Sequence, residues 1–269
     1  MSDRERIETS FDVRGARLRG TLEGEGPLVI WGHGLSSDRW AMENDGVMDW
    51  APVVDAGHTL LRLDWRGHGE SGGGTDPAEY AWSSLGDDLL ALVDDVSPDA
   101  PVAAIGCSMG TGAILHAAVA APERFRALVL TAPPTAWETR PAQVDGYRAI
   151  AEVAEQGGRA AVARLFGMQP TPGVLGELDA PPQVSVDDAL LPAVLRGAAL
   201  SDLPAPDAIA ALSIPALILS WAGDPGHPVS TGERLHEMIG GSRFAVAATL
   251  GDVREWGTSA AAFLSEVAA

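Results

Sequence analysis

Lysine is absent from this chain of 269 residues, and all 18 of its basic residues are arginine. The absence excludes enzymes that bind a substrate carbonyl or pyridoxal phosphate through a lysine, and nucleotide-binding proteins with a Walker-type loop. Asp and Glu together number 37, which gives a formal net charge of −19 at pH 7. Because this charge repels phosphate backbones and anionic lipids, we expect neither nucleic acid nor a membrane as a partner.

Cysteine is nearly absent as well, with Cys107 as its one occurrence. A single cysteine forms no internal disulfide, which indicates a reducing compartment. No apolar run reaches the roughly 20 residues of a membrane-spanning helix, and residues 1–6 are too charged for a signal peptide. No pair of histidines has metal-ligand spacing with supporting carboxylates. These features predict a cytoplasmic protein that binds a small-molecule substrate without a metal or cofactor, and they leave its oligomeric state open.

The stretch from Ala103 to Ala121 has the pattern of a buried strand, a sharp turn and a helix. Its turn, residues 106–110, reads G-C-S-M-G, which fits the G-x-S-x-G pattern of a nucleophile elbow. Such a reversal forces its middle residue into a strained backbone conformation and exposes its hydroxyl. The two glycines are required because a Cβ at either position would collide with the neighbouring strand or helix. Ser108 is therefore the candidate nucleophile.

Short apolar segments alternate with helical patterns along the rest of the chain. This alternation predicts an α/β fold with a mostly parallel, twisted sheet and helices on both faces. The predicted strands are 9–13 and 16–22, joined as an edge hairpin at Gly15, then 27–31, 59–63, 103–105, 127–131, 216–221 and 244–248. The predicted helices are 39–51, one capped by Ser83 or Ser84, 111–121, 142–156, 158–166, 186–199 and one opened by a capping box at residues 230–233.

Three motifs taken together resemble the α/β-hydrolase-fold family. They are the His33-Gly34 pair after an apolar strand, the run D-x-R-G-x-G-x-S from Asp64 to Ser71, and the elbow at Ser108. The resemblance covers residues 28–131 and 215–267. It implies chemistry of the serine esterase or lactonase kind, with the 64–71 run as a structural loop.

The resemblance also implies roles for particular residues. The backbone N–H groups of Leu35 and Met109 would form an oxyanion hole, which stabilises charge on a carbonyl oxygen when Ser108 attacks it. Asp224, which follows the 216–221 strand, matches the position of the acid that orients the catalytic imidazole.

The family's catalytic histidine usually follows the last strand, and this chain has none there. Four explanations remain open. His227, three residues after Asp224, could supply the imidazole from the acid's own loop. Asp252 could act as a carboxylate base if crowding raised its pKa, although its surroundings also fit a capping box. His33 is a third candidate base, although its motif position indicates that it holds the oxyanion loop. Finally, the chain could be a non-hydrolytic homologue, a ligand-binding protein or biosynthetic helper that has lost its base.

The segment 133–206 differs in composition from the rest, with many Pro and Gly residues. The resemblance implies that it forms a helical cap inserted between two parts of the core, residues 1–132 and 207–269. We expect His33, Trp137 and Tyr147 to contact the substrate, and Arg140 to lie on a solvated helix face. The predicted function is hydrolysis of a small, mostly apolar ester or lactone through an acyl-Ser108 intermediate.

Overall fold

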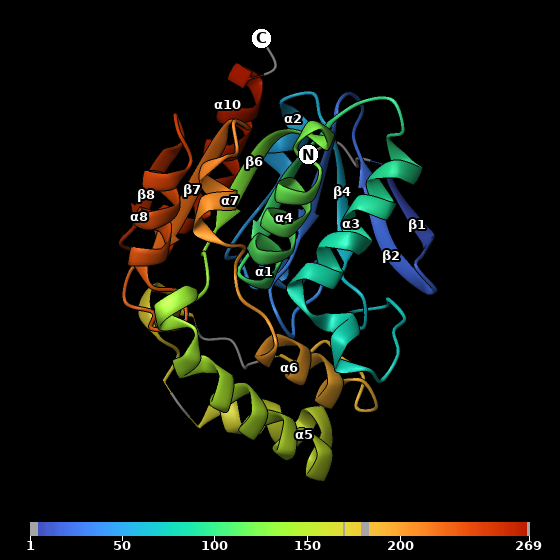
Figure 1. Ribbon diagram of the computed structural model, residues 1–269, viewed down its shortest axis with the longest axis vertical. Helices are drawn as coiled ribbons and strands as arrows, with labels where there is room; N and C mark the ends of the chain where they lie inside the picture. The colour runs from blue at the N-terminus through green and yellow to red at the C-terminus, as the bar shows by residue number, and fades with distance from the viewer. Residues whose placement is uncertain (1–4, 169, 179–182, 268–269) are drawn as a thin grey trace.

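The computed structural model describes residues 5–168, 170–178 and 183–267, and in it one sheet runs through the molecule (Figure 1). Its eight strands lie in the order β1-β2-β4-β3-β5-β6-β7-β8. Their bounds are β1 (Arg6–Val13), β2 (Ala16–Glu23), β3 (Leu28–Gly32), β4 (Thr59–Asp64), β5 (Val102–Cys107), β6 (Phe125–Thr131), β7 (Ala216–Trp221) and β8 (Arg243–Ala247).

The first two strands form an antiparallel hairpin at one edge, and β2 also pairs antiparallel with β4. All other neighbours pair in parallel. The predicted edge hairpin and the mostly parallel sheet are therefore confirmed. Because parallel strands run in the same direction, the carboxyl ends of β3, β5 and β7 all lie at one edge of the sheet.

Helices cover both faces of this sheet. The α-helices are α1 (Ala41–Asn44), α2 (Ala51–Asp55), α3 (Trp82–Val96), α4 (Met109–Ala120), α5 (Pro141–Gly167), α6 (Leu191–Ala199), α7 (Pro206–Ala210), α8 (Val229–Met238), α9 (Leu250–Arg254) and α10 (Trp256–Val267). The 3₁₀ turns are η1 (Pro77–Tyr80), η2 (Pro122–Arg124), η3 (Trp137–Thr139) and η4 (Gly173–Glu177). α3, α4, α7 and α8 pack on one face, and α2 and α10 pack on the other.

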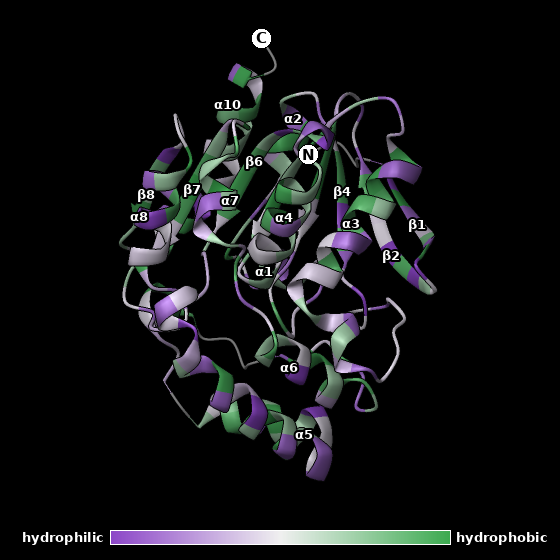
Figure 2. Cartoon of the chain, viewed as in Figure 1, coloured by the Kyte–Doolittle hydropathy of each residue, from purple (hydrophilic) through white to green (hydrophobic). Residues whose placement is uncertain are grey.

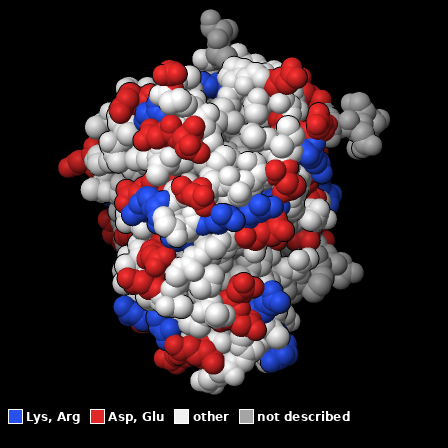
Figure 3. Space-filling view, turned by 90° about the vertical axis from the view of Figure 1, so that its right-hand side faces the viewer, with Lys and Arg blue, Asp and Glu red and all other residues white. Residues whose placement is uncertain are grey.

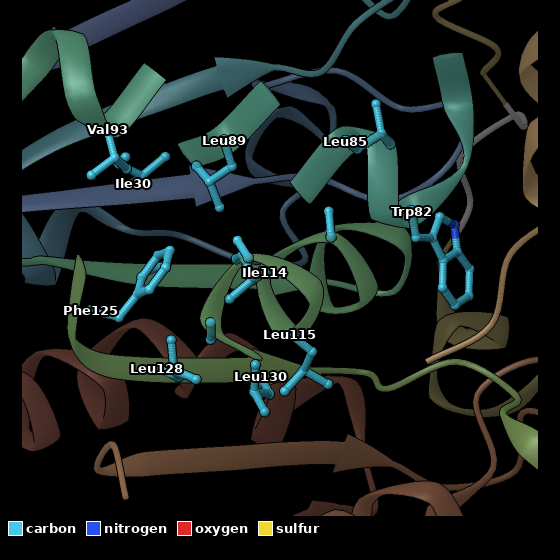
Figure 4. Close-up of a cluster of buried hydrophobic side chains, with 14 of the residues drawn as sticks. Ile30, Trp82, Leu85, Leu89, Val93, Ile114, Leu115, Phe125, Leu128 and Leu130 are labelled. Carbon is cyan, nitrogen blue, oxygen red and sulfur yellow. The ribbon is translucent and has the colours of Figure 1, made fainter. Parts of the chain in front are cut away.

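Each face of the sheet has its own hydrophobic core. In α3, Leu85, Leu89 and Val93 recur at helical spacing, so that they share one side of the helix and meet Ile114 of α4 (Figure 4). The central strands are apolar on both sides, as Figure 2 shows, because helices cover both. The shape of the sheet is thus fixed by two layers of apolar packing around β3, β5 and β6.

Several predicted helix bounds were wrong. The stretch 39–51 holds the short helix α1 and the start of α2, separated by a turn in which Gly46 adopts a φ of 67°. α3 begins at Trp82, whose N–H donates to Ser201 Oγ, so neither predicted serine caps it. α8 begins after Pro228 with no side-chain cap, so the predicted capping box at 230–233 does not form.

The segment between β6 and β7 contains η3, α5, η4, α6 and α7, and α5 and α6 lie beyond one end of the sheet (Figure 1). α5 is interrupted at Gly157 and Gly158, where the two predicted helices meet. The predicted helix over 186–199 is shorter, because Val186 pairs with His68 in an isolated bridge and α6 starts only at Leu191. A third apolar cluster fills this region, and Leu35 packs against both this cluster and the core of the sheet.

Acidic side chains are spread over the molecular surface with arginines among them, as on the face shown in Figure 3. No described helix combines the length and the apolar character that crossing a membrane requires.

Candidate active site

Ser108 lies at the sharp reversal between β5 and α4. Its φ of 52° and ψ of −110° are strained for a residue with a side chain. A Cβ on Gly110 would lie 2.2 Å from the carbonyl oxygen of Gly32, and one on Gly106 would lie 2.6 Å from the carbonyl carbon of Gly110. Both predicted collisions are therefore confirmed, and the two glycines let strand and helix approach closely enough to present the Ser108 hydroxyl.

Three side chains form one hydrogen-bonded row at this edge of the sheet. His227 Nε2 lies 2.7 Å from Ser108 Oγ, and His227 Nδ1 lies 2.6 Å from Asp224 Oδ2. Asp224 and His227 both come from the loop between β7 and α8, where the N–H of His227 donates to the Asp224 carbonyl. A tight turn thus places carboxylate and imidazole in line, and the alignment of β5 with β7 brings the hydroxyl to them.

The Asp224 carboxylate is well buried, with 9% of the residue exposed. Burial raises its pKa, but the hydrogen bond and charge of His227, with bonds from the Gly226 N–H and the Trp221 indole, outweigh burial and hold the pKa below its usual value. The Trp221 ring also meets the His227 ring edge to face, with centroids 5.4 Å apart. The carboxylate is therefore charged at neutral pH and holds the imidazole in a fixed orientation.

The loop after β3 approaches Ser108 from the other side. A Cβ on Gly34 would lie 3.5 Å from Ser108 Cβ, so the backbone of this loop is adjacent to the hydroxyl. Leu35 follows Gly34, and Ser36 then adopts a φ of 62°. Met109 is the first residue of α4, a place where a backbone N–H has no partner within the helix.

His33 is fully buried, which contradicts its expected contact with the substrate. Its Nδ1 is 2.8 Å from the Gly34 carbonyl oxygen, and its Nε2 accepts a hydrogen bond from the Trp65 N–H. Burial lowers the pKa of His33 to about 4. A neutral ring with both nitrogens engaged supports the loop, as its motif position indicated, and is not available as a base.

Asp252, the alternative base, lies on the surface in a capping box. Thr249 is the cap of α9, and Asp252 Oδ2 accepts from the N–H groups of Ala248 and Thr249. The hydrogen bond from the Thr249 hydroxyl is the first of the contacts that lower the pKa of Asp252. The pKa shift that general-base chemistry would need is therefore in the opposite direction, and the side chain serves the helix.

The hydrogen bonds and ring contacts of Trp137 and Tyr147 lie away from the hydrogen-bonded row. The Trp137 indole donates to the Pro204 carbonyl, and the Arg234 guanidinium lies over its ring. The Arg140 guanidinium carbon lies 5.1 Å from the centre of the Tyr147 ring. Within the described ranges, no hydrogen bond or ring contact joins either aromatic residue to the catalytic candidates.

Arg140 is 2% exposed, which contradicts the expected solvated position. Its guanidinium stacks on the Trp82 ring and donates to the carbonyl oxygens of Ala198 and Ser201. These contacts tie the start of α5 to the end of α6. The sequence patterns missed this role because a burial site made of three distant segments has no local signature.

Within the part of the chain that the structure describes, no cluster of three or more His, Cys, Asp and Glu side chains is arranged to hold a metal ion.

Comparisons with known proteins find similar sequences and similar folds. Residues 27–157 match the family model described as alpha/beta hydrolase fold. The chain is 31% identical over 108 residues to palmitoyl-protein thioesterase ABHD10, mitochondrial, of Rattus norvegicus, a match that covers 40% of this chain and 35% of that protein. The chain thus matches about a third of the length of this relative.

Two solved structures share the fold along nearly the whole chain. The enol-lactonase from Burkholderia xenovorans LB400 has a TM-score of 0.75 at 21% identity, with 96% of this chain and 100% of that chain covered. A thermophilic esterase from Thermogutta terrifontis has a TM-score of 0.75 at 22% identity, with 98% and 99% covered. The match to the family model, the sheet order and the whole-chain structural likeness agree, and the chain has the α/β-hydrolase fold.

Proposed function

We propose that this chain is a serine hydrolase that cleaves a small, mostly apolar ester or lactone through an acyl-Ser108 intermediate. The observation that carries the proposal is the continuous row from Ser108 Oγ through both nitrogens of His227 to Asp224, with separations of 2.7 and 2.6 Å. A serine hydroxyl is a weak nucleophile until a base accepts its proton, and this row supplies one.

The proposed reaction follows from this geometry. His227 Nε2 accepts the hydroxyl proton as Ser108 Oγ attacks the carbonyl carbon, and Asp224 stabilises the imidazolium that forms. The same imidazole then donates this proton to the leaving oxygen, so that the alcohol departs and the acyl group stays on the serine. Water, activated by His227 in the same way, releases the acid and restores the hydroxyl.

We propose that the N–H groups of Leu35 and Met109 stabilise the oxyanion during both attacks. Support comes from their positions, one beside Gly34 in the loop against Ser108 and the other at the start of α4. Neither N–H group donates to another group among the described residues. Two free donors beside the reacting carbon can each lower the barrier by about 3 kcal/mol.

We further propose that the segment 133–206 acts as a cap between the core parts 1–132 and 207–269, and that it selects the substrate. Its own apolar cluster packs on Leu35, next to the proposed oxyanion donor. The similar proteins include a thioesterase, an enol-lactonase and an esterase, so we propose that acyl thioesters be tried as substrates beside esters and lactones. The cytoplasmic location and the substrate contacts of Trp137 and Tyr147 remain predictions.

The function is tested with a fluorophosphonate probe and with p-nitrophenyl esters of increasing acyl length, together with lactones and acyl thioesters. We expect the protein to be labelled and to turn over short esters, and Ser108→Ala to lose both activities. Ser259→Ala, which changes an exposed serine on α10, is the matched control and should behave like the unchanged protein. A protein that is neither labelled nor active would favour the non-hydrolytic, ligand-binding alternative.

A further inference from the structure

Ser185, in the segment between η4 and α6, is joined to the core by three hydrogen bonds. Its N–H donates to the Ser36 carbonyl at 2.8 Å, and its hydroxyl donates to Asp38 Oδ2 at 2.7 Å. Its carbonyl accepts the N–H of Gly69 at 2.7 Å. One residue of the proposed cap is therefore hydrogen-bonded, through its backbone and its side chain, to the loop that follows β3.

The loop that Ser185 holds is the one that contains Leu35. Ser36 comes directly after Leu35 and has a φ of 62°, a conformation that a residue with a side chain keeps only when its surroundings hold it. A weak turn bond from the Ser37 N–H to the Gly34 carbonyl, at 3.3 Å, closes the loop from inside. The shorter bond to Ser185 holds the same turn from outside.

Asp38 anchors the far end of the loop. Its Oδ1 accepts the N–H groups of Trp40 and Ala41 at the start of α1, while Oδ2 accepts the Ser185 hydroxyl. Burial raises the pKa of Asp38, but these hydrogen bonds outweigh burial and leave the pKa below its usual value. The carboxylate is thus charged, and a hydrogen bond to a charged acceptor is about twice as strong as a neutral one.

The contact between Ser185 and Asp38 borders a cavity. Asp38 and Ser185 line a cavity of about 810 Å³ whose wall also includes Arg159 of α5 and Glu70. The loop and the cap are thus connected by the packing of Leu35 on the third apolar cluster and, beside this cavity, by the hydrogen bonds of Ser185.

We infer that Ser185 is a positioning residue, which sets the direction of the Leu35 N–H by holding Ser36 and Asp38 and so couples the cap to the oxyanion hole. The inference rests on the proposed function. If the cap moves away from the core, the loop is released and the Leu35 N–H no longer points at the oxyanion. Ser108, His227 and Asp224 stay in place.

The test compares Ser185→Ala with Ser185→Thr, which keeps the hydroxyl. We expect Ser185→Ala to lower kcat for an ester about 5- to 20-fold with KM nearly unchanged, because a hydrogen bond to a charged group is lost where it orients the transition state. Binding of a trifluoromethyl ketone, which forms a tetrahedral oxyanion on Ser108, should weaken by the same factor as kcat/KM. Ser185→Thr should restore most of both values.

Ser201→Ala is the matched control, since it also removes a serine hydroxyl that bonds this segment to the core, through the Trp82 N–H. It should lower the unfolding temperature without separating kcat from KM. Asp38→Asn provides a second perturbation of the same contact. If the Asp38 carboxylate and the Ser185 hydroxyl act through one contact, the fold-loss of kcat in the double variant will be smaller than the product of the two single losses.

The inference is overturned if Ser185→Ala keeps the kcat and the ketone affinity of the unchanged protein. It is also overturned if all the serine variants lose activity only in proportion to their stability. Labelling of the unchanged protein is measured first. If the unchanged protein is not labelled, the proposed function fails, and this inference fails with it. That outcome differs from an active enzyme whose kcat does not change in Ser185→Ala, which overturns this inference alone.

Discussion

Replacing His227 by alanine removes the proton acceptor that the structure places 2.7 Å from the Ser108 hydroxyl. General-base catalysis contributes about 10² to 10⁴ in rate. At 1.36 kcal/mol for each factor of ten, this corresponds to about 3 to 5 kcal/mol of barrier. We therefore expect kcat to fall at least 100-fold in His227→Ala while KM changes little, because the imidazole acts on the reacting bonds.

The assay is steady-state turnover of the best p-nitrophenyl ester, with chemical denaturation in parallel to show that the variant is folded. The His227 side chain is 24% exposed, but its loss removes a hydrogen-bond partner of the buried Asp224 carboxylate, so the stability of the variant is measured beside its turnover. Asp252→Asn is the matched control, since it changes the carboxylate at the place where the family usually has its histidine. It should weaken the cap of α9 and leave kcat unchanged.

Two results would refute the assignment of His227. The first is a folded His227→Ala protein that keeps kcat within about tenfold of the original, which is less than a general base contributes. The second is a loss of turnover in Asp252→Asn without a loss of stability. Either result would mean that the hydrogen-bonded row is not the path of the proton.

Two further predictions concern stability. Gly110→Ala should destabilise the fold by about 3 kcal/mol or more, because the new Cβ would lie 2.2 Å from the Gly32 carbonyl oxygen. Gly240→Ala is the control, since the space at its Cβ is open. Equal denaturation midpoints for the two variants would contradict the close approach at the elbow. Asp224 has a lowered pKa, so its ionisation stabilises the fold above its ordinary value of 3.8, and this stability is lost as the pH falls through the lowered pKa. Unfolding midpoints measured from about pH 7 to about pH 3 should therefore fall less steeply in Asp224→Asn, and parallel curves would contradict the shift.

Local sequence patterns were sufficient for the elements that are specified within a few residues. The elbow needs glycine on either side of Ser108 because strand and helix touch there, and both requirements are visible in five consecutive residues. The apolar runs of β3, β5 and β7 are equally local, since both faces of each strand are buried. Together with the three motifs, these runs predicted the fold family.

Helix bounds and buried charges were less predictable. The stretch 39–51 has a helical pattern, yet α1 is a single turn that ends at Asn44, and Gly46 then adopts a positive φ. Arg140 has the composition of a surface residue, and its place under Trp82 depends on carbonyl groups about 60 residues further along the chain. Propensity is a weak prior, and tertiary contacts override it at such positions.

By itself, the sequence determined that a hydroxyl would stand at a sharp reversal in a parallel sheet, because that geometry depends on neighbours in the chain. It left four explanations open for the missing base, since residues 108 and 227 have no relation in the sequence that reveals their contact. The tertiary structure decided the geometry. β6 lies between β5 and β7 in the sheet, all three strands point the same way, and their carboxyl ends bring Ser108 and His227 within a hydrogen bond, while Asp252 is held in its own capping box.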